Sequence, residues 1–218
     1  MFPSHDQRDK FQYFNPRFLL KEGDQWYYNN NRLNVYAAVD FAYSMEQKAD
    51  YTAIVVIGID SDGNIYVLDI DRFKTTKAID YFKRIKDLHS TWNFKKIQAE
   101  ITAAQAVIVD SIKDYVRKDG LRIKVEEFRP SKREGSKEER IAAALEPKYE
   151  ELMVYHREGG WTGVLEDELI LARPPHDDIK DALASAVSIA VRPARSKKSK
   201  IADFMGSGFG GSRFGGFQ

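Results

Sequence analysis

Three apolar segments open the regular part of the chain. Near Asn34 the sequence becomes LNVYAAVDFAY, an apolar run broken by a single acid, which is typical of a strand buried on both faces. YTAIVVIGI at 51–59 and NIYVLDI at 64–70 have the same character, and the DSDG between them is a hairpin turn signal. The pattern predicts three consecutive strands, of which the last two are antiparallel.

Helical and strand-like segments alternate after these strands. Apolar residues recur at helical spacing over 78–88 and 104–115. SKEERIAAAL at 136–145 starts with a capping box, and a last helix begins near Asp177. The strand-like segments between the helices are 94–100, 122–128 and 152–156. The order β-β-β-α-β-α-β-α-β-α predicts an α/β fold with a mixed central sheet flanked by helices.

The two ends of the chain differ from this pattern. Residues 1–33 are polar and aromatic without a sustained period, so we expect a lead-in or interdomain linker ahead of one domain at 34–191. Residues 192–218 begin with RPARSKKSK and end in GSGFGGSRFGGFQ. This low-complexity segment predicts a flexible tail, which is either a solvated end or an arm that contacts DNA or a partner.

Composition narrows the classes of protein and site. The 218 residues are enough for one domain with a core, and 34 basic against 33 acidic residues give no global reason to expect a nucleic-acid or membrane partner. The sequence has no cysteine, which excludes disulfides, zinc–thiolate sites and thiol catalysis. It also has neither an apolar run of about 20 residues nor a signal-peptide core, so we expect a soluble intracellular protein.

Two acids stand where predicted strands end. Asp40 interrupts the apolar first strand, and a buried carboxylate there needs a cation, a charged partner or hydrogen bonds. Glu100 closes the strand KKIQAE just before a helix, at the end where α/β sheets present side chains to ligands. Each has an ordinary alternative: Asp40 as a strand end turning into a loop, and Glu100 as an acid favoured by the helix macrodipole.

Three aspartates lie at the start of the last predicted helix, in HDDIKDALASA. At about 100° per residue, with Ile179 and Leu183 on the core side, Asp178 lies on a flank and Asp177 points mostly to solvent. Asp181 lies between them and shares a face with Asp178, one turn away. We therefore expect Asp178 to reach a site at the sheet edge, Asp181 to be a second ligand and Asp177 to be the N-cap.

Taken together, these acids predict a metal site. Carboxylate oxygens without cysteine suit Mg²⁺ or Mn²⁺. Two such ions can activate a water and stabilise the leaving oxygen of an in-line phosphoryl transfer. No single local motif identifies the reaction, but the combination favours it.

The residues in this order resemble the ribonuclease H-like nuclease domain of the large terminase subunit of tailed bacteriophages and herpesviruses. VDFAYSMEQKADYTAIVVI resembles the first motif of that family, an acid on strand one followed by a loop and a second Asp before strand two. AEITAAQ resembles its second-acid motif, KEERI with LEPKYE resembles its basic helix, and HDDIKDALASA resembles its last motif. The resemblance spans about residues 34–191.

The resemblance implies a metal-dependent endonuclease that cuts concatemeric double-stranded viral DNA during genome packaging. It implies that Asp40 bridges two ions, that Glu100 holds one, and that Asp178 with Asp181 or Asp177 holds the other. The related Holliday-junction resolvases end in a similar D-x-x-D-A-L pattern, which favours Asp178 with Asp181. The alternatives are a junction resolvase of the same fold and a non-catalytic module that binds DNA or a portal protein.

The resemblance also implies a domain context, partners and a location. The full subunit of that family has a packaging ATPase, whereas this sequence has no G-x-x-x-x-G-K-[ST] phosphate loop, so we expect an excised domain or a free-standing relative. The implied partners are double-stranded DNA, the packaging ATPase domain of the same polypeptide, the portal protein and the small terminase subunit. The implied location is the host cell cytoplasm.

A basic cluster between the last two motifs is the predicted DNA contact, made through phosphates rather than bases. Its members are Lys132, Arg133, Lys137 and Arg140. The alternative is a solvated, salt-bridged helix, because Glu134, Glu138 and Glu139 lie among them. His176 is either a helix-entry residue or one that orients water or substrate.

Overall fold

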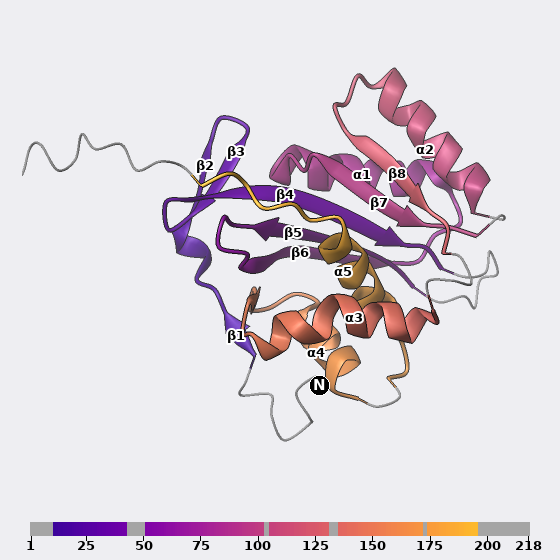
Figure 1. Ribbon diagram of the computed structural model, residues 1–218. Coiled ribbons are helices and arrows are strands. Elements are labelled where there is room, and N and C mark those ends of the chain that lie inside the picture. The colour runs from indigo at the N-terminus through magenta and orange to yellow at the C-terminus, as the bar shows by residue number, and fades with distance from the viewer. Residues whose placement is uncertain (1–10, 43–50, 103–104, 131–134, 172–173, 196–218) are drawn as a thin grey trace, which may run out of the picture.

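The computed structural model describes residues 11–42, 51–102, 105–130, 135–171 and 174–195. Within this part of the chain, nine strands form one mixed sheet (Figure 1). They are β1 (Gln12–Tyr13), β2 (Leu19–Glu22), β3 (Gln25–Tyr28), β4 (Asn31–Asp40), β5 (Thr52–Ile59), β6 (Ile65–Phe73), β7 (Lys96–Glu100), β8 (Lys124–Phe128) and β9 (Val154–His156). The helices are α1 (Ala78–Trp92), α2 (Ala106–Lys118), α3 (Lys137–Glu150), α4 (Thr162–Ile170) and α5 (Asp178–Ser188), with a 3-10 turn at Pro16–Phe18.

The long strand β4 lies at the centre of the sheet. One edge of β4 pairs with β5, antiparallel, and the other edge pairs first with β3 and then, from Ala37 to Asp40, with β7. β7 is parallel to β4 and carries β8, also parallel, on its outer edge. The carboxyl ends of β4 and β7 therefore lie side by side.

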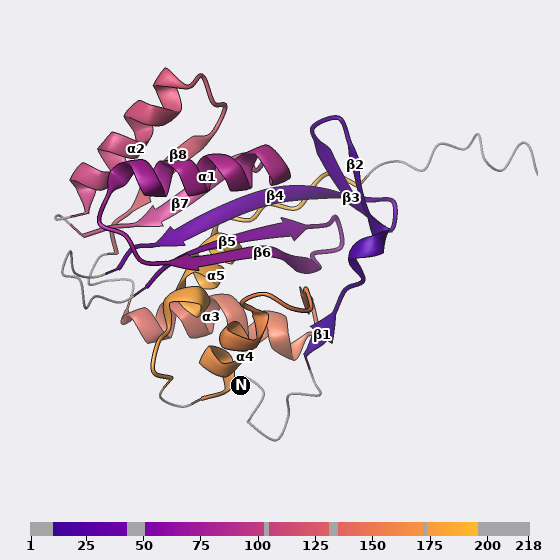
Figure 2. The same ribbon diagram turned by 180° about the vertical axis from the view of Figure 1, so that it is seen from behind.

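Helices cover both faces of this sheet, with a separate apolar core under each layer (Figures 1 and 2). α1 and α2 pack on one face, and α3, α4 and α5 on the other. Strand residues alternate between the two cores: Ala37 and Val39 of β4 face α1 and α2, whereas Tyr36 and Ala38 face α5. By the same alternation, Asp40 lies on the α5 face.

A β-bulge interrupts the pairing of β5 with β6. Ile57 lies opposite Val67, but Val56 lies opposite Asp69, so Leu68 is an extra residue on β6. Odd-numbered residues of β6 face α3, α4 and α5 before the bulge, and even-numbered residues face them after it. The bulge thus sets which side chains at the end of β6 lie on the α5 face.

The predicted α/β fold with a mixed, helix-flanked sheet is confirmed. Each predicted strand and helix is present, and the hairpin falls at DSDG as expected. The sequence pattern missed α4, because its buried side includes Glu166 and Glu168 next to Leu165 and Leu169, so no apolar stripe marks it. It also ended α3 too early, since that helix continues through Pro147 to Glu150.

Residues 1–33 were expected to be a lead-in or interdomain linker ahead of the domain, but the described residues from 11 onward are part of its sheet and core. β2 and β3 form a hairpin on the edge of β4, and β1 pairs in parallel with β9. Phe11 is buried and stacks on His156 at 4.9 Å, and Trp26 packs on Trp92 at 4.8 Å. Strands this short carry little periodic signal and depend on tertiary contacts with distant residues.

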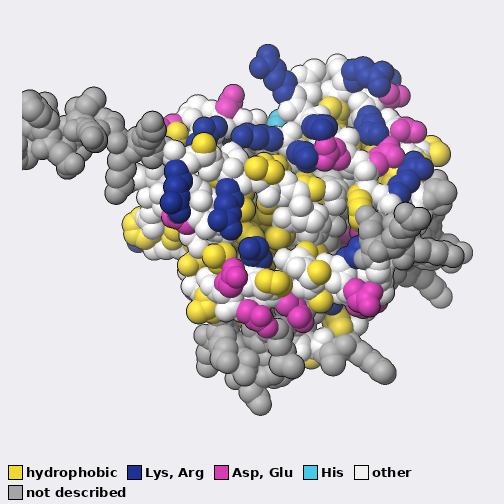
Figure 3. All heavy atoms as spheres, viewed as in Figure 1, with side chains coloured by type: hydrophobic (Ala, Val, Ile, Leu, Met, Phe, Trp, Pro, Cys, Tyr) yellow, Lys and Arg dark blue, Asp and Glu magenta, His cyan; other side chains and the backbone are white. Residues whose placement is uncertain are grey.

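The described surface is of mixed charge. On the face shown in Figure 3, Lys and Arg side chains gather over the upper half with Asp and Glu side chains among them, and further Asp and Glu side chains lie along the lower edge. None of the described helices is long and apolar enough to cross a bilayer.

Docking of β1 gives a testable difference between two phenylalanines. Phe11→Ala should lower the free energy of unfolding by about 3–5 kcal/mol, because it empties a buried site against Tyr149 and His156. Phe18→Ala should cost less than about 1 kcal/mol, because Phe18 is 54% exposed. Urea denaturation measures both. Equal, small effects would mean that the segment does not contribute to the domain.

Candidate functional site

One row of paired residues crosses the sheet at the carboxyl end of β4. Glu100 lies opposite Asp40, Asp40 lies opposite Ala53, and Ala53 lies opposite Arg72. Residues directly opposite one another in a sheet share a face, so all four point toward α5. Strand register alone therefore brings the two predicted strand acids together, with a small residue and then a cation beside them.

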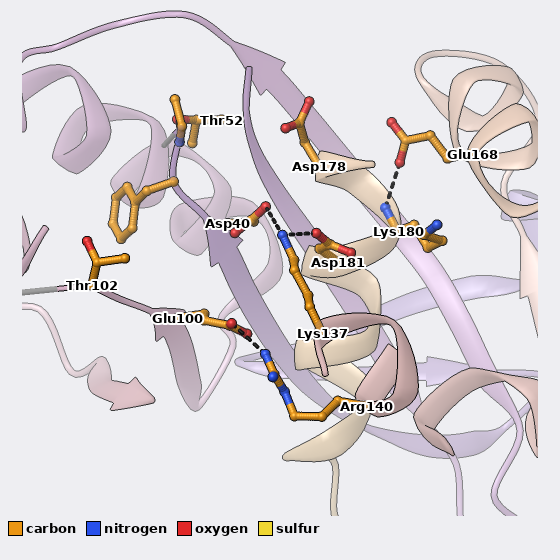
Figure 4. Close-up of polar contacts among 12 residues, drawn as sticks. Asp40, Thr52, Glu100, Thr102, Lys137, Arg140, Glu168, Asp178, Lys180 and Asp181 are labelled. Carbon is orange, nitrogen blue, oxygen red and sulfur yellow. Dashed lines mark hydrogen bonds and ion pairs between the residues drawn. The ribbon is translucent and has the colours of Figure 1, made fainter. Parts of the chain in front are cut away.

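The start of α5 supplies the next two acids. Asp178 is 5% exposed and Asp181 is 4% exposed, and both point into the space over the sheet (Figure 4). Asp177 is exposed at the N-cap position. The helical geometry expected from the sequence holds for all three, since the flank that carries Asp178 and Asp181 is the buried one.

Three cationic side chains face these acids. Lys137 Nζ lies 3.6 Å from Asp40 Oδ2 and also contacts Asp181 Oδ2, so it bridges the two carboxylates (Figure 4). Arg140 Nη2 donates to Glu100 Oε1 at 2.6 Å. On the far side of the row, Arg72 Nη2 pairs with Asp178 Oδ2 at 3.3 Å. Each of the four carboxylates thus has a cationic contact.

Crowding and burial change the proton affinity of these groups. Burial raises the pKa of Asp40 to about 8, against the charge of Lys137 and assisted by the neighbouring Asp181 and Asp178. Burial likewise raises the pKa of Asp181 to about 6 and that of Asp178 above its usual value. Burial alone would lower the pKa of Lys137, but the charges of Asp40 and Asp181 outweigh it and raise that pKa. Burial therefore disfavours the charged forms of Asp40, Asp178 and Asp181.

A hollow of about 220 Å³ opens beside the row. Asp40, Glu100, Asp178 and Lys137 line it, and exposed Asp177 stands at its rim. A second hollow of about 90 Å³ lies under α3, where Glu100, Arg140 and Asp181 form part of the wall. Asp40, Glu100 and Asp178 can therefore be reached from solvent through the first of these openings, whereas Asp181 borders the second.

The donor set fits a hard divalent cation. Among the described residues, those of the row and of the start of α5 that line the hollow are all acids, and carboxylate oxygens are the ligands that Mg²⁺ and Mn²⁺ prefer. Asp181 Oδ1 is buried without a hydrogen-bond donor among the described residues. In the described part of the chain no three carboxylates converge on a single point, because each turns toward its cationic partner. A metal would be held only after Lys137 turns away from Asp40 and Asp181 and Arg140 turns away from Glu100.

The N-terminus of α5 is capped by a residue that the sequence did not predict. Asp177 occupies the N-cap position, as expected, but its side chain makes no capping hydrogen bond. Glu168 of α4 accepts the backbone N–H of Lys180 at 2.8 Å instead. Burial raises the pKa of Glu168 to about 8. The missed helix α4 therefore supports the helix that carries the acids.

Two further unpredicted residues brace the ends of the strands. Gln105 donates to the carbonyls of Phe41 and Ala42, at 3.3 and 3.2 Å, and accepts the N–H of Thr102 at 2.8 Å. It thereby ties the segment after β4 to the segment after β7. Thr52 accepts the N–H of Ala42 at 3.2 Å. The AEITAAQ motif contains Gln105, but no signal in the sequence assigned it this contact.

The predicted DNA-contacting residues divide into two groups. Lys137 and Arg140 lie on the first turns of α3 and face the acids, whereas the sequence suggested contacts with the glutamates of the same segment or with DNA phosphates. Lys132 and Arg133 lie outside the described residues. His176 packs edge-on against Tyr51, with ring centroids 5.3 Å apart.

This chain is similar to a known protein family and to several solved structures. A family model described as a terminase RNaseH-like domain matches residues 37–190. The large terminase nuclease of thermophilic phage G20c has a TM-score of 0.53 and 18% identity, over 83% of this chain and 95% of that one. The nuclease domain of large terminase subunit gp2 of bacterial virus Sf6 has a TM-score of 0.52 and 12% identity, over 74% and 89%. At these identities the structural likeness establishes an RNase H-like fold.

A mutant of the same Sf6 domain, solved with manganese, has a TM-score of 0.51 and 11% identity, over 71% of this chain and 88% of that one. No curated protein matches the sequence.

The capping arrangement predicts which acid supports α5. Glu168→Ala should lower the free energy of unfolding by about 1–3 kcal/mol, because it removes the acceptor for an N-terminal N–H of the helix. Asp177→Ala should cost no more than about 0.5 kcal/mol, because that side chain makes no capping bond. Chemical denaturation compares the two variants. A larger loss for Asp177→Ala would contradict the assignment of the cap.

Proposed function

The chain belongs to the family of terminase RNaseH-like domains, and from this we propose that it is a metal-dependent endonuclease. Its substrate is concatemeric double-stranded viral DNA, which it cuts during genome packaging by hydrolysing phosphodiester bonds. The observation that carries this proposal is the cross-strand pair Asp40–Glu100, facing Asp178 and Asp181 at one end of the sheet. Asp40, Glu100 and Asp178 line one solvent-connected hollow, and buried Asp181 is linked to Asp40 through Lys137. Such a group of acids is costly to maintain unless it holds a cation.

Divalent ions, Mg²⁺ or Mn²⁺ and two in number, are the proposed cofactor. Asp40 would be shared, Glu100 would hold one ion, and Asp178 with Asp181 would hold the other. Bound ions supply Lewis-acid stabilisation of the phosphoryl group and lower the pKa of a bound water. The raised pKa of Asp40 supports this assignment, because a carboxylate whose charged form is disfavoured by burial gains stability from a bound cation.

Lys137 and Arg140 are proposed to exchange partners during the reaction. In the described structure Lys137 pairs with Asp40 and Asp181, and Arg140 pairs with Glu100. Lys137 is 39% exposed and sits at the start of α3, so its flexible side chain can turn to a phosphate without moving the helix. With Lys132 and Arg133 just upstream in the sequence, the pair would grip the DNA backbone without reading its bases.

The partners of the protein and its place of action are proposed from its family membership. The partners would be a packaging ATPase domain of the same polypeptide, the portal protein and the small terminase subunit, and the place of action would be the host cell cytoplasm. The mixed charge of the face in Figure 3 supports local rather than global attraction of DNA.

The first test removes the shared acid. Asp40→Asn should reduce cleavage of plasmid DNA in Mn²⁺ to background, because the amide cannot bridge two cations. Its melting temperature should not fall, because the substitution removes a buried negative charge from a crowded site. Nicking and linearisation are followed on gels, and EDTA should stop cleavage by the wild type until Mn²⁺ is restored. Unimpaired cutting by Asp40→Asn would exclude the proposed site.

The second test separates the three aspartates of α5. Asp178→Asn and Asp181→Asn should each abolish cleavage, whereas Asp177→Asn should keep most of it, because Asp177 is exposed and lies outside the buried group. The same plasmid assay measures all three. Loss of activity in Asp177→Asn alone would reverse the assignment.

Cutting four-way junctions far better than linear duplex would instead favour a resolvase.

A further inference from the structure

Arg72 is a buried cation at the far end of the row of site residues. Its side chain is 7% exposed, and it pairs with Asp178, whose side chain is 8% exposed. Arg72 lies opposite Ala53, which lies opposite Asp40, so the guanidinium stands two strands from the central acid and on the same face. Adjacent strands are about 4.8 Å apart, which places its Cα roughly 10 Å from that of Asp40.

Aromatic rings fix the position of this guanidinium. Its central carbon lies 3.7 Å from the centroid of the Tyr51 ring and 5.8 Å from that of Trp161. Tyr51 is itself contacted by Lys74 at 4.3 Å and by His176 edge-on. A guanidinium stacked on a ring loses little further freedom when it forms a hydrogen bond. Arg72 is therefore a rigid donor aimed at one oxygen of Asp178.

Stability alone does not account for this pair. Burying two charges costs about as much as their attraction returns, so an apolar pair of similar volume would serve the core as well. In addition, Arg72 Nε is buried without a hydrogen-bond partner among the described residues. Within the described part of the chain, the hydrogen bond that Arg72 donates thus goes to an acid that lines the hollow beside Asp40 and Glu100.

We propose that Arg72 is a positioning residue that holds Asp178 Oδ2, so that Oδ1 stays turned toward the hollow as a metal ligand. This inference rests on the proposed function and adds an outer support to its metal site. Outer partners of ligating side chains fix their orientation, and losing one typically weakens metal binding about 10–100-fold. Arg72 touches neither the acids of the strands nor, by this proposal, the DNA.

The chain contains a matched control for this arginine. Arg84 also pairs with an aspartate, Asp71, at 2.9 Å, and also stacks on a ring, Phe73, at 4.1 Å. Phe73 faces the opposite core, under α1 and α2. Arg84 therefore has the same kinds of contact as Arg72 without any connection to the site.

The test compares Arg72→Gln, Arg72→Lys and Arg84→Gln. Mn²⁺ binding is titrated without DNA by calorimetry and by electron paramagnetic resonance, and plasmid cleavage is measured over a range of Mn²⁺ concentrations. Arg72→Gln should raise the dissociation constant for Mn²⁺ about 10-fold or more, and high Mn²⁺ should restore much of its cleavage. Arg72→Lys should fall between it and the wild type, whereas Arg84→Gln should match the wild type.

The outcomes separate the two levels of proposal. If the wild type binds Mn²⁺ and Arg72→Gln binds it equally well, with only a lower melting temperature, Arg72 is structural and the inference is overturned while the nuclease proposal stands. If the wild type neither binds Mn²⁺ nor cuts DNA, the proposed function fails and this inference fails with it. Melting curves without metal show that each variant is folded.

Discussion

Repulsion among buried carboxylates is the interaction on which the rest of the structure depends. Asp40 and Glu100 are adjacent because they lie opposite each other on the parallel strands β4 and β7. Asp178 and Asp181 lie close to them because α5 packs on the same face of the sheet. Such a group is stable only with compensating charge. Lys137, Arg140 and Arg72 supply it from three separate elements. The acids therefore determine what the surrounding helices and strands must carry.

The acids could be predicted from the sequence, but most of the residues that contact them, or that hold the segments carrying them, could not. Asp40 and Glu100 interrupt or end apolar strands, and helical spacing separates buried Asp178 and Asp181 from exposed Asp177. Arg72 lies beyond the predicted end of its strand, so no pattern linked it to the site. The remaining supports depend on contacts between distant segments: Glu168 caps α5 from an unpredicted helix, and Gln105 joins two loops.

The first strands show the same limit in another form. β1 has two residues, and β2 and β3 have four each, so alternation cannot be distinguished from chance in any of them. What stabilises them is aromatic packing onto β9 and α1, which a local pattern does not encode. Order in this segment follows from its neighbours rather than from its own composition.

The extra residue in β6 determines the sign of the charge beside the central acid. Up to Val67 the paired residue numbers of β5 and β6 add to 124, and beyond Leu68 they add to 125. Continued without the bulge, the first register would set Asp71, not Arg72, across from Ala53. The bulge at Leu68 thus places an arginine, rather than a fifth carboxylate, two strands from Asp40 on the same face of the sheet.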